Sequence, residues 1–368
     1  AAILLNTAKA GITADQAAAI TASTSLSSIL INNSVLKYAR DYTARVLADS
    51  GIVEGITNLR NIFSPIFSSA VFDSFNFVLI PSGVKTSKLY SLILENGSND
   101  MIVLRNTIAT RKNILGIVED SAVNVARINY PTIGGSPFLL DEAQDTNTSN
   151  FSENIANSFY SKVDISVSVV SEINPRGVLS SNKLIPNTLA TQHYFSTNNN
   201  KKVLSVFAKA NGYSTVILYY TIHNSYVIFN ALTGDILFTN GSVTGQVEVF
   251  GNGYFRFSTV STLGTHGQSR VYVVNGTTFG DRNIAGNGVD GINFFGHQTS
   301  DILTSYISSL GEAATTRNAD VITVAPPSGT LKITTTFSDN TSQVLTTIPS
   351  TYTVPEGLIK SILMNSTL

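Results

Sequence analysis

Four oxygen-bearing side chains fall within one short segment of the sequence: Asp281, Asn283, Asn287 and Asp290. Carboxylate and amide oxygens are the ligands that Ca²⁺ takes in proteins, so this segment is a candidate calcium site. The same residue types also favour tight turns, because Asp and Asn side chains hydrogen-bond to the backbone of their own loop. We favour the turn interpretation, and we expect no cofactor unless a structural calcium ion binds here.

The sequence contains no recognisable catalytic pattern. Its histidines are not paired at metal-binding spacing, and the absence of cysteine excludes thiolate chemistry. Glu142, Asp145 and Glu153 share one polar stretch. Glycoside hydrolysis, however, needs two carboxyl groups at a set separation across a cleft, and nearness in sequence does not supply this. We therefore expect that the chain is not an enzyme.

Aromatic and planar polar side chains on the expected strands are the remaining functional signal. Sugars are commonly bound by an aromatic ring against their apolar face, beside hydrogen-bonding amide or charged groups. The candidate glycan-binding residues of this kind are Tyr194, Tyr220, Tyr226, Asn224, Arg256 and Gln298. Packing in the core of a β-sheet is the competing interpretation for each of them.

Hydrophobic alternation predicts that β-strands position these residues. In residues 163–170, valine and isoleucine alternate with Asp164 and two serines, which is typical of a strand with one buried face. Further short segments of this kind follow, separated by Gly, Asn and Ser turns. Many short strands at this spacing indicate a mainly β fold, a sandwich or a barrel. Of the two, we expect an antiparallel β-sandwich.

The pattern along the chain divides it into four predicted regions. Apolar residues at helical spacing at the start and a Pro-Pro pair at 326–327 mark the outer boundaries. The regions are a helical connector or anchor over 1–67, a small β-rich connecting region over 68–146, the β-sandwich over 147–322, and a small C-terminal β-unit over 323–368.

Composition restricts the classes of partner. Charged residues make up 13% of the chain, against about 25% in ordinary globular proteins. The formal net charge is −1 and no basic block occurs, so we expect no nucleic-acid binding. No apolar run is long enough for a bilayer-spanning helix, so we also expect no membrane span.

Several segments resemble, in order, a recurring block of tailed-phage and prophage structural proteins. Examples are Ala-Arg-Ile-Asn-Tyr at 126–130 and Gly-Asn-Gly-Tyr-Phe-Arg-Phe at 251–257. The other matching segments are 80–83, 109–113, 116–119, 139–147, 295–298, 304–307 and 316–320. Two departures are Asp145, where an arginine is usual, and Tyr254, where a tryptophan is usual.

The resemblance implies a phage tail fibre, spike or appendage protein on the outside of the virion. It also implies that the sandwich is a jelly-roll like those of carbohydrate-binding modules and concanavalin-type lectins. The partners it implies are further copies of the chain, with a homotrimer favoured, other virion proteins and host cell-surface polysaccharide. The alternative is a purely structural capsid, vertex or baseplate component whose jelly-roll contacts other proteins.

Overall fold

The computed structural model describes residues 77–78, 90–91, 101–198, 200–263, 267–326 and 328–365. All of them belong to the compact unit Asn76–Leu368. The predicted helical connector over 1–67 lies outside the described residues. Within the part of the chain that the structure describes, no helix has the length and hydrophobicity needed to cross a bilayer.

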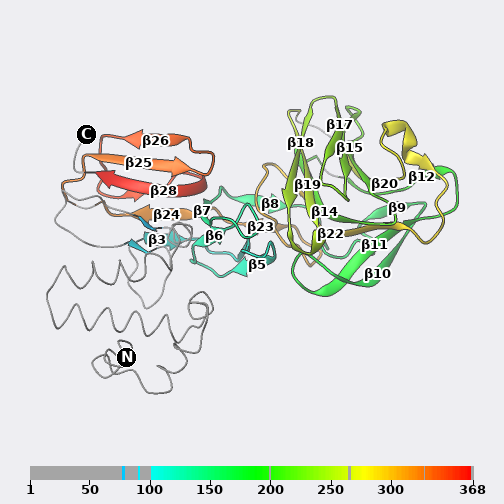
Figure 1. Ribbon diagram of the computed structural model, residues 1–368, viewed down its shortest axis with the longest axis horizontal. Coiled ribbons are helices and arrows are strands. Elements are labelled where there is room, and N and C mark those ends of the chain that lie inside the picture. Colours follow the sequence, from blue (N-terminus) through cyan, green and yellow to red (C-terminus); the bar gives the residue numbers. More distant parts are fainter. Residues whose placement is uncertain are drawn as a thin grey trace, which may run out of the picture. The chain divides into compact units, whose positions relative to one another are not determined.

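Two six-stranded antiparallel sheets form a β-sandwich, drawn in green to yellow in Figure 1. In spatial order, sheet 1 contains β10 (Ile165–Ile173), β11 (Leu179–Pro186), β22 (Gly291–Ser300), β14 (Val203–Asn211), β19 (Phe255–Ser261) and β18 (Val243–Val249). Sheet 2 contains β17 (Ile236–Asn240), β16 (Ser225–Asn230), β15 (Thr215–Tyr220), β20 (Gln268–Val274), β13 (Tyr194–Asn198) and β9 (Ser161–Val163). The predicted mainly β, antiparallel fold is confirmed, whereas the jelly-roll assignment stays a prediction.

The sandwich core lies between the two sheets and follows from the alternation of each strand. On β15, Val216 and Leu218 are buried in the core shared with sheet 1, while the intervening Ile217 belongs to a separate cluster on the outer face. Phe229 of sheet 2 stacks on Phe257 of sheet 1 with ring centroids 4.7 Å apart. Burial of this apolar surface is the main stabilising term of the sandwich.

The alternating segment 163–170 is two strands rather than the single predicted strand. Asp164 has a left-handed backbone, with φ of 52°, which ends β9 of sheet 2 and lets the chain cross to β10 of sheet 1. Its carboxylate accepts hydrogen bonds from the Thr191 hydroxyl at 2.6 Å and the Asn187 amide at 3.2 Å. An isolated non-glycine residue tolerates this conformation best when it is Asp or Asn.

A second, smaller β-unit combines strands from both sides of the sandwich sequence (Figure 1). Its three-stranded sheet contains β27 (Tyr352–Thr353), β24 (Val321–Val324) and β3 (Met101–Leu104). Its five-stranded sheet contains β26 (Ser342–Leu345), β25 (Lys332–Phe337), β28 (Gly357–Asn365), β7 (Phe138–Asp141) and β6 (Arg127–Asn129). Met101, Leu139, Ile322 and Ile333 share its core. The C-terminal β-unit therefore includes strands that the sequence placed in the connecting region, and the four domain boundaries stay a prediction.

Short pairs of strands complete the described structure. They are β8 (Asp145–Asn147) with β23 (Thr315–Arg317), β4 (Ala109–Lys112) with β5 (Val118–Ser121), β12 (Thr191–Gln192) with β21 (Asn283–Ile284), and β1 (Phe77–Val78) with β2 (Tyr90–Ser91). Two 3₁₀ turns, η1 (Gly251–Gly253) and η2 (Phe279–Arg282), lie in loops of the sandwich. The β8–β23 pair lies where the chain passes between the small β-unit and the sandwich.

Candidate functional site

A row of aromatic rings crosses the outer face of sheet 2. We call it the tyrosine face, and its members are Tyr194, Tyr219, Tyr226, Tyr272 and Phe279. Strand register places the tyrosines together, because directly opposed residues share a face of an antiparallel sheet. Tyr194 on β13 is opposite Tyr272 on β20, and Tyr219 on β15 is opposite Tyr226 on β16.

The rings of the tyrosine face contact one another continuously. Ring centroids are 4.9 Å apart for Tyr194 and Tyr272, and 6.0 Å apart for Tyr219 and Tyr272. Phe279 of η2 stacks on Tyr226, with centroids 3.9 Å apart and planes 10° from parallel. Tyr226 and Tyr272 are buried, whereas Tyr194, Tyr219 and Phe279 are partly exposed. The exposed rings therefore have fixed orientations and a free surface.

Two arginines pack against rings of this row. The guanidinium of Arg270 is 4.5 Å from the Tyr194 ring centroid, and that of Arg282 is 3.9 Å from the Phe279 ring centroid. Arg270 also donates from Nε to Gln268 Oε1 at 2.7 Å and from Nη1 to the Tyr272 hydroxyl at 3.1 Å. Stacked guanidinium groups of this kind present donors beside an aromatic surface.

The structure brings two of the six predicted glycan-binding residues together on this face, Tyr194 and Tyr226. Asn224 is exposed in the turn before β16, with φ of 46°. Its carbonyl accepts a hydrogen bond from the Asn240 amide at 2.7 Å. Asn224 is thus a turn residue next to the tyrosine face. The buried Tyr226 packs against the partly exposed rings of Tyr219 and Phe279.

The other three predicted glycan-binding residues are buried in the structure. Tyr220 and Gln298 are 0% exposed and Arg256 is 1% exposed. Each is engaged inside the protein. The Tyr220 hydroxyl donates to Lys202 O at 2.9 Å, and Gln298 Oε1 accepts from the Ile307 amide at 2.8 Å. Arg256 Nη1 donates to Thr304 O at 2.7 Å.

Sequence reasoning missed Tyr219, Tyr272, Phe279 and Arg270. Tyr219 and Tyr220 point to opposite faces, and the sequence alone does not distinguish the faces because Ile217 and Val216 leave both sides of β15 apolar. Arg270 was the detectable signal, since an arginine inside a strand requires a polar or solvent-facing side.

The candidate calcium ligands instead serve local turns. Asp281 Oδ2 accepts hydrogen bonds from the backbone amides of Thr277 at 3.0 Å and Thr278 at 2.8 Å, which lowers the pKa of Asp281. Asn287 Oδ1 accepts from the Asp290 amide at 2.8 Å, while Asn283 lies in β21. No group of three or more acidic or histidine side chains suited to a metal occurs among the described residues. Calcium at this segment stays an untested prediction.

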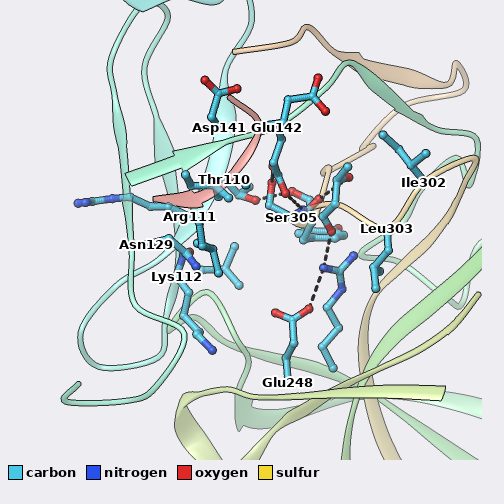
Figure 2. Close-up of a pocket in the computed structure, with 18 of the residues that line it drawn as sticks. Thr110, Arg111, Lys112, Asn129, Asp141, Glu142, Glu248, Ile302, Leu303 and Ser305 are labelled. Carbon is cyan, nitrogen blue, oxygen red and sulfur yellow. Dashed lines mark hydrogen bonds and ion pairs between the residues drawn. The ribbon is translucent and has the colours of Figure 1, made fainter. Parts of the chain in front are cut away.

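A pocket of about 450 Å³ lies between the small β-unit and the sandwich. Figure 2 shows Asp141 and Glu142 on one side of this junction pocket and Glu248 on the other. Lys112 also lines the pocket, and its Nζ donates to Pro131 O at 2.6 Å and Val249 O at 3.0 Å. Burial lowers the pKa of Lys112, although the nearby Glu248 opposes that effect.

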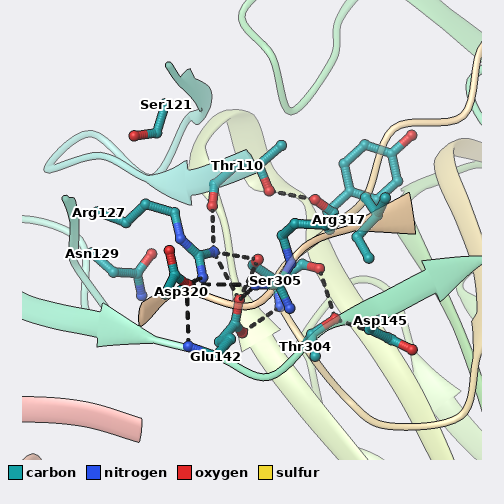
Figure 3. Close-up of polar contacts among 12 residues, drawn as sticks. Thr110, Ser121, Arg127, Asn129, Glu142, Asp145, Thr304, Ser305, Arg317 and Asp320 are labelled. Carbon is teal, nitrogen blue, oxygen red and sulfur yellow. Dashed lines mark hydrogen bonds and ion pairs between the residues drawn. The ribbon is translucent and has the colours of Figure 1, made fainter. Parts of the chain in front are cut away.

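A buried ionic cluster centred on Asp320 adjoins this pocket (Figure 3). Asp320 Oδ1 is 2.6 Å from Arg105 Nη1, and its Oδ2 pairs with Arg127 Nη2. Arg317 Nη1 is 3.4 Å from Glu142 Oε2 and 3.5 Å from Asp320 Oδ2. We call these five residues the Asp320 cluster. They come from β6, β23 and the loops beside β3, β7 and β24, so the cluster joins distant segments.

The charge states in the Asp320 cluster depend on its mutual contacts. Burial alone would raise the pKa of Glu142, but Arg127 and Arg317 hold it below its ordinary value. Ser305 adds hydrogen bonds to Glu142 from its amide and its hydroxyl, both at 2.7 Å. Burial would lower the pKa of Arg127, yet Glu142 and Asp320 raise it. Each charge is therefore stabilised by an opposite charge.

Asp141 also lines the junction pocket, but it has no ion pair like those that stabilise the charges of Glu142 and Arg127 among the described residues. It is 2% exposed, and its Oδ2 has no hydrogen-bond partner. Burial and the charges of Asp320 and Glu356 raise the pKa of Asp141 to about 8, although Arg127 opposes the shift. At neutral pH this side chain is mainly a protonated acid, able to donate a hydrogen bond.

Comparison with known proteins identifies no family for this chain. No protein-family model matches the chain, and no curated protein matches it. Among solved structures, the chain is similar to the crystal structure of the enzymatically active domain of bacteriophage CBA120 tailspike protein 4. The identity is 10% and the TM-score is 0.25, and the match covers 43% of this chain and 21% of that chain.

This finding corrects one expectation. The sequence led us to expect that the chain is not an enzyme, and the match to an enzymatically active domain contradicts that expectation. A TM-score of 0.25 establishes neither a shared fold nor a shared activity. Activity therefore has to be tested at a site of this chain.

Asp320→Asn should strongly destabilise the protein, because it leaves buried arginines without a counter-charge. We expect a loss of about 3–5 kcal/mol in the free energy of unfolding, measured by urea denaturation. Asp301→Asn is the matched control, since Asp301 pairs with Lys201 at the surface and should contribute less than about 1 kcal/mol. Similar losses in the two variants would contradict the role assigned to the Asp320 cluster.

Asp141→Asn should change how stability depends on pH. The pKa of Asp141 is about 8 in the folded protein and about 3.9 in an unfolded chain, so the folded state holds the proton more tightly. Its stabilising contribution is complete below about pH 4 and is lost as the pH rises to about 8. The wild type should lose stability relative to the variant by about 1.4 kcal/mol per pH unit over that window.

Chemical denaturation of both proteins at a series of pH values measures this difference. Using the difference removes the contributions of titrating groups that do not interact with Asp141. Parallel curves for wild type and variant would show that Asp141 does not keep its proton in the folded state.

Proposed function

We propose that this chain is a bacteriophage tail-associated virion protein that adheres to host surface glycans through the tyrosine face. The observation that carries the proposal is the row of fixed, partly exposed rings with two arginines packed against it. Tyr194 and Tyr219 offer apolar surfaces to a sugar ring. Arg270, which is held in place by Gln268, offers hydrogen-bond donors beside them.

The virion assignment is supported by the sequence resemblance over residues 76–322 and by the low charge content. On this proposal the protein lies on the outside of the particle as a fibre, spike or appendage. Its further partners are other virion proteins and copies of itself, with a trimer favoured.

The alternative of a purely structural component is supported by one other surface. The β10–β11 hairpin exposes aliphatic side chains that include Val169 (66% exposed), Ile173 (43%) and Leu179 (64%). Exposed aliphatic groups of this kind suit contact with another protein. This surface and the tyrosine face are compatible, because one can attach the protein while the other binds a ligand.

Replacing the exposed rings should remove glycan binding without unfolding the protein. We expect the double variant Tyr194→Ala/Tyr219→Ala to bind at least about tenfold more weakly, because stacking surface is lost. A glycan array followed by calorimetry on the bound glycans measures the effect. Tyr130→Ala is the matched control, since Tyr130 is partly exposed outside the face. Equal binding by both variants, or no glycan binding by the wild type, would reject the proposal.

Glycan cleavage in the junction pocket is a second candidate function. It is favoured by the buried Asp141, whose Oδ2 is unpartnered and whose raised pKa keeps it protonated at neutral pH. A protonated carboxylic acid can donate its proton to a glycosidic oxygen, while a carboxylate across the site activates water. We assign this role to Glu248, which lies on the other side of the pocket in Figure 2 and 3.5 Å from Arg256 Nη1.

A reducing-end assay on polysaccharides that the protein binds tests this candidate. Turnover by the wild type should fall at least about a hundredfold in Asp141→Asn and in Glu248→Gln, as expected for loss of acid–base catalysis. The control Glu119→Gln alters a carboxylate outside the pocket lining and should retain turnover. Absence of turnover by the wild type on bound polysaccharides would reject cleavage.

A further inference from the structure

Positive charge on the tyrosine face is not neutralised by neighbouring acids. Among the described residues, no carboxylate lies within ion-pair distance of Arg270 or Arg282. The carboxylate next in sequence, that of Asp281, accepts the backbone amides of Thr277 and Thr278 instead. Arg282 donates from Nη1 to Phe279 O at 2.7 Å, which fixes its guanidinium over the Phe279 ring.

The guanidinium of Arg270 is held in place and retains donors for a ligand. Its Nε and Nη1 are fixed by Gln268 and the Tyr272 hydroxyl, and the Tyr194 ring packs against it. Nη2 donates to no described residue. Because Arg270 is directly opposite Tyr219 in the strand register, these free donors lie beside a partly exposed ring. A prepositioned arginine loses little conformational freedom when it binds a carboxylate.

We propose that the tyrosine face selects saccharides that carry a carboxylate, such as uronic or sialic acid residues. Tyr194 and Tyr219 contact the apolar face of the sugar, and Arg270 donates hydrogen bonds to its carboxylate. Arg282 attracts a second acidic residue along the same chain. This inference rests on the proposed glycan binding and adds the chemical class of the glycan.

The test uses the full chain and pairs of probes that differ only in charge. Alginate, polygalacturonate and polysialic acid are each compared with their carboxyl-reduced forms, and dextran serves as a neutral polymer. We expect binding to at least one acidic probe that is at least about tenfold tighter than to its reduced form, since charge-assisted hydrogen bonds are lost on reduction. Equal affinity for acidic and reduced forms would overturn the inference.

The variant Arg270→Gln tests selectivity for the carboxylate separately from glycan binding itself. We expect it to weaken binding of the acidic probe by about tenfold and to leave binding of the reduced form unchanged. Lys360→Gln removes one positive charge at an exposed position of β28, and should leave both affinities unchanged. Thermal melting checks that each variant is folded.

The outcomes distinguish a failure of this inference from a failure of glycan binding. Binding that depends on Tyr194 and Tyr219 but is insensitive to Arg270→Gln overturns the acidic-sugar inference alone. A loss of equal size in Arg270→Gln and Lys360→Gln also overturns it, because the effect would then reflect net charge. No binding to any acidic, reduced or neutral probe counts against both proposals.

Discussion

The described structure depends most on the ion pairs of the buried Asp320 carboxylate. Three arginines with 0–1% exposed side chains, Arg105, Arg127 and Arg317, lie around it and Glu142. Buried charges are tolerated only when they are paired and hydrogen-bonded, and the loss of one partner leaves the others uncompensated. These residues come from the small β-unit and from the β8–β23 link to the sandwich. The Asp320 cluster therefore connects the small β-unit to the β8–β23 pair. Its member Glu142 also lines one side of the junction pocket.

The segments that resemble phage structural proteins converge on this cluster. Segments 126–130, 139–147 and 316–320 supply Arg127, Glu142, Arg317 and Asp320, and segment 304–307 supplies the hydroxyl and amide that bind Glu142. The departure at Asp145 is consistent with this arrangement. Asp145 is directly opposite Arg317 across β8 and β23, where its carboxylate adds to the negative charges near Arg317. The resemblance thus describes how the molecule is held together.

Local pattern allowed the strands to be predicted, whereas long-range contacts could not be. Alternation identified most strands of the sandwich, because a half-buried strand leaves a period of two. It failed at Asp164, where one left-handed residue moves the chain between sheets. The Arg105–Asp320 pair joins residues 215 positions apart, and no local spacing encodes such a contact. The outer-face tyrosine of the Tyr219–Tyr220 pair could not be identified because β15 is apolar on both sides, so only the packed sandwich distinguishes the two.

The tyrosine face and the Asp320 cluster are built from separate parts of the sequence. None of the five aromatic residues of the face lies in a segment that carries the resemblance, and none contacts the cluster's charges. Substitutions on the outer surface of sheet 2 leave the sandwich core unchanged, because alternate residues of each strand point to the opposite side of the sheet. Ring positions and the arginines beside them can therefore differ without disturbing the buried ion pairs. On the proposed function, a scaffold held by internal charges can present different sugar-binding surfaces, which suits recognition of varied glycans.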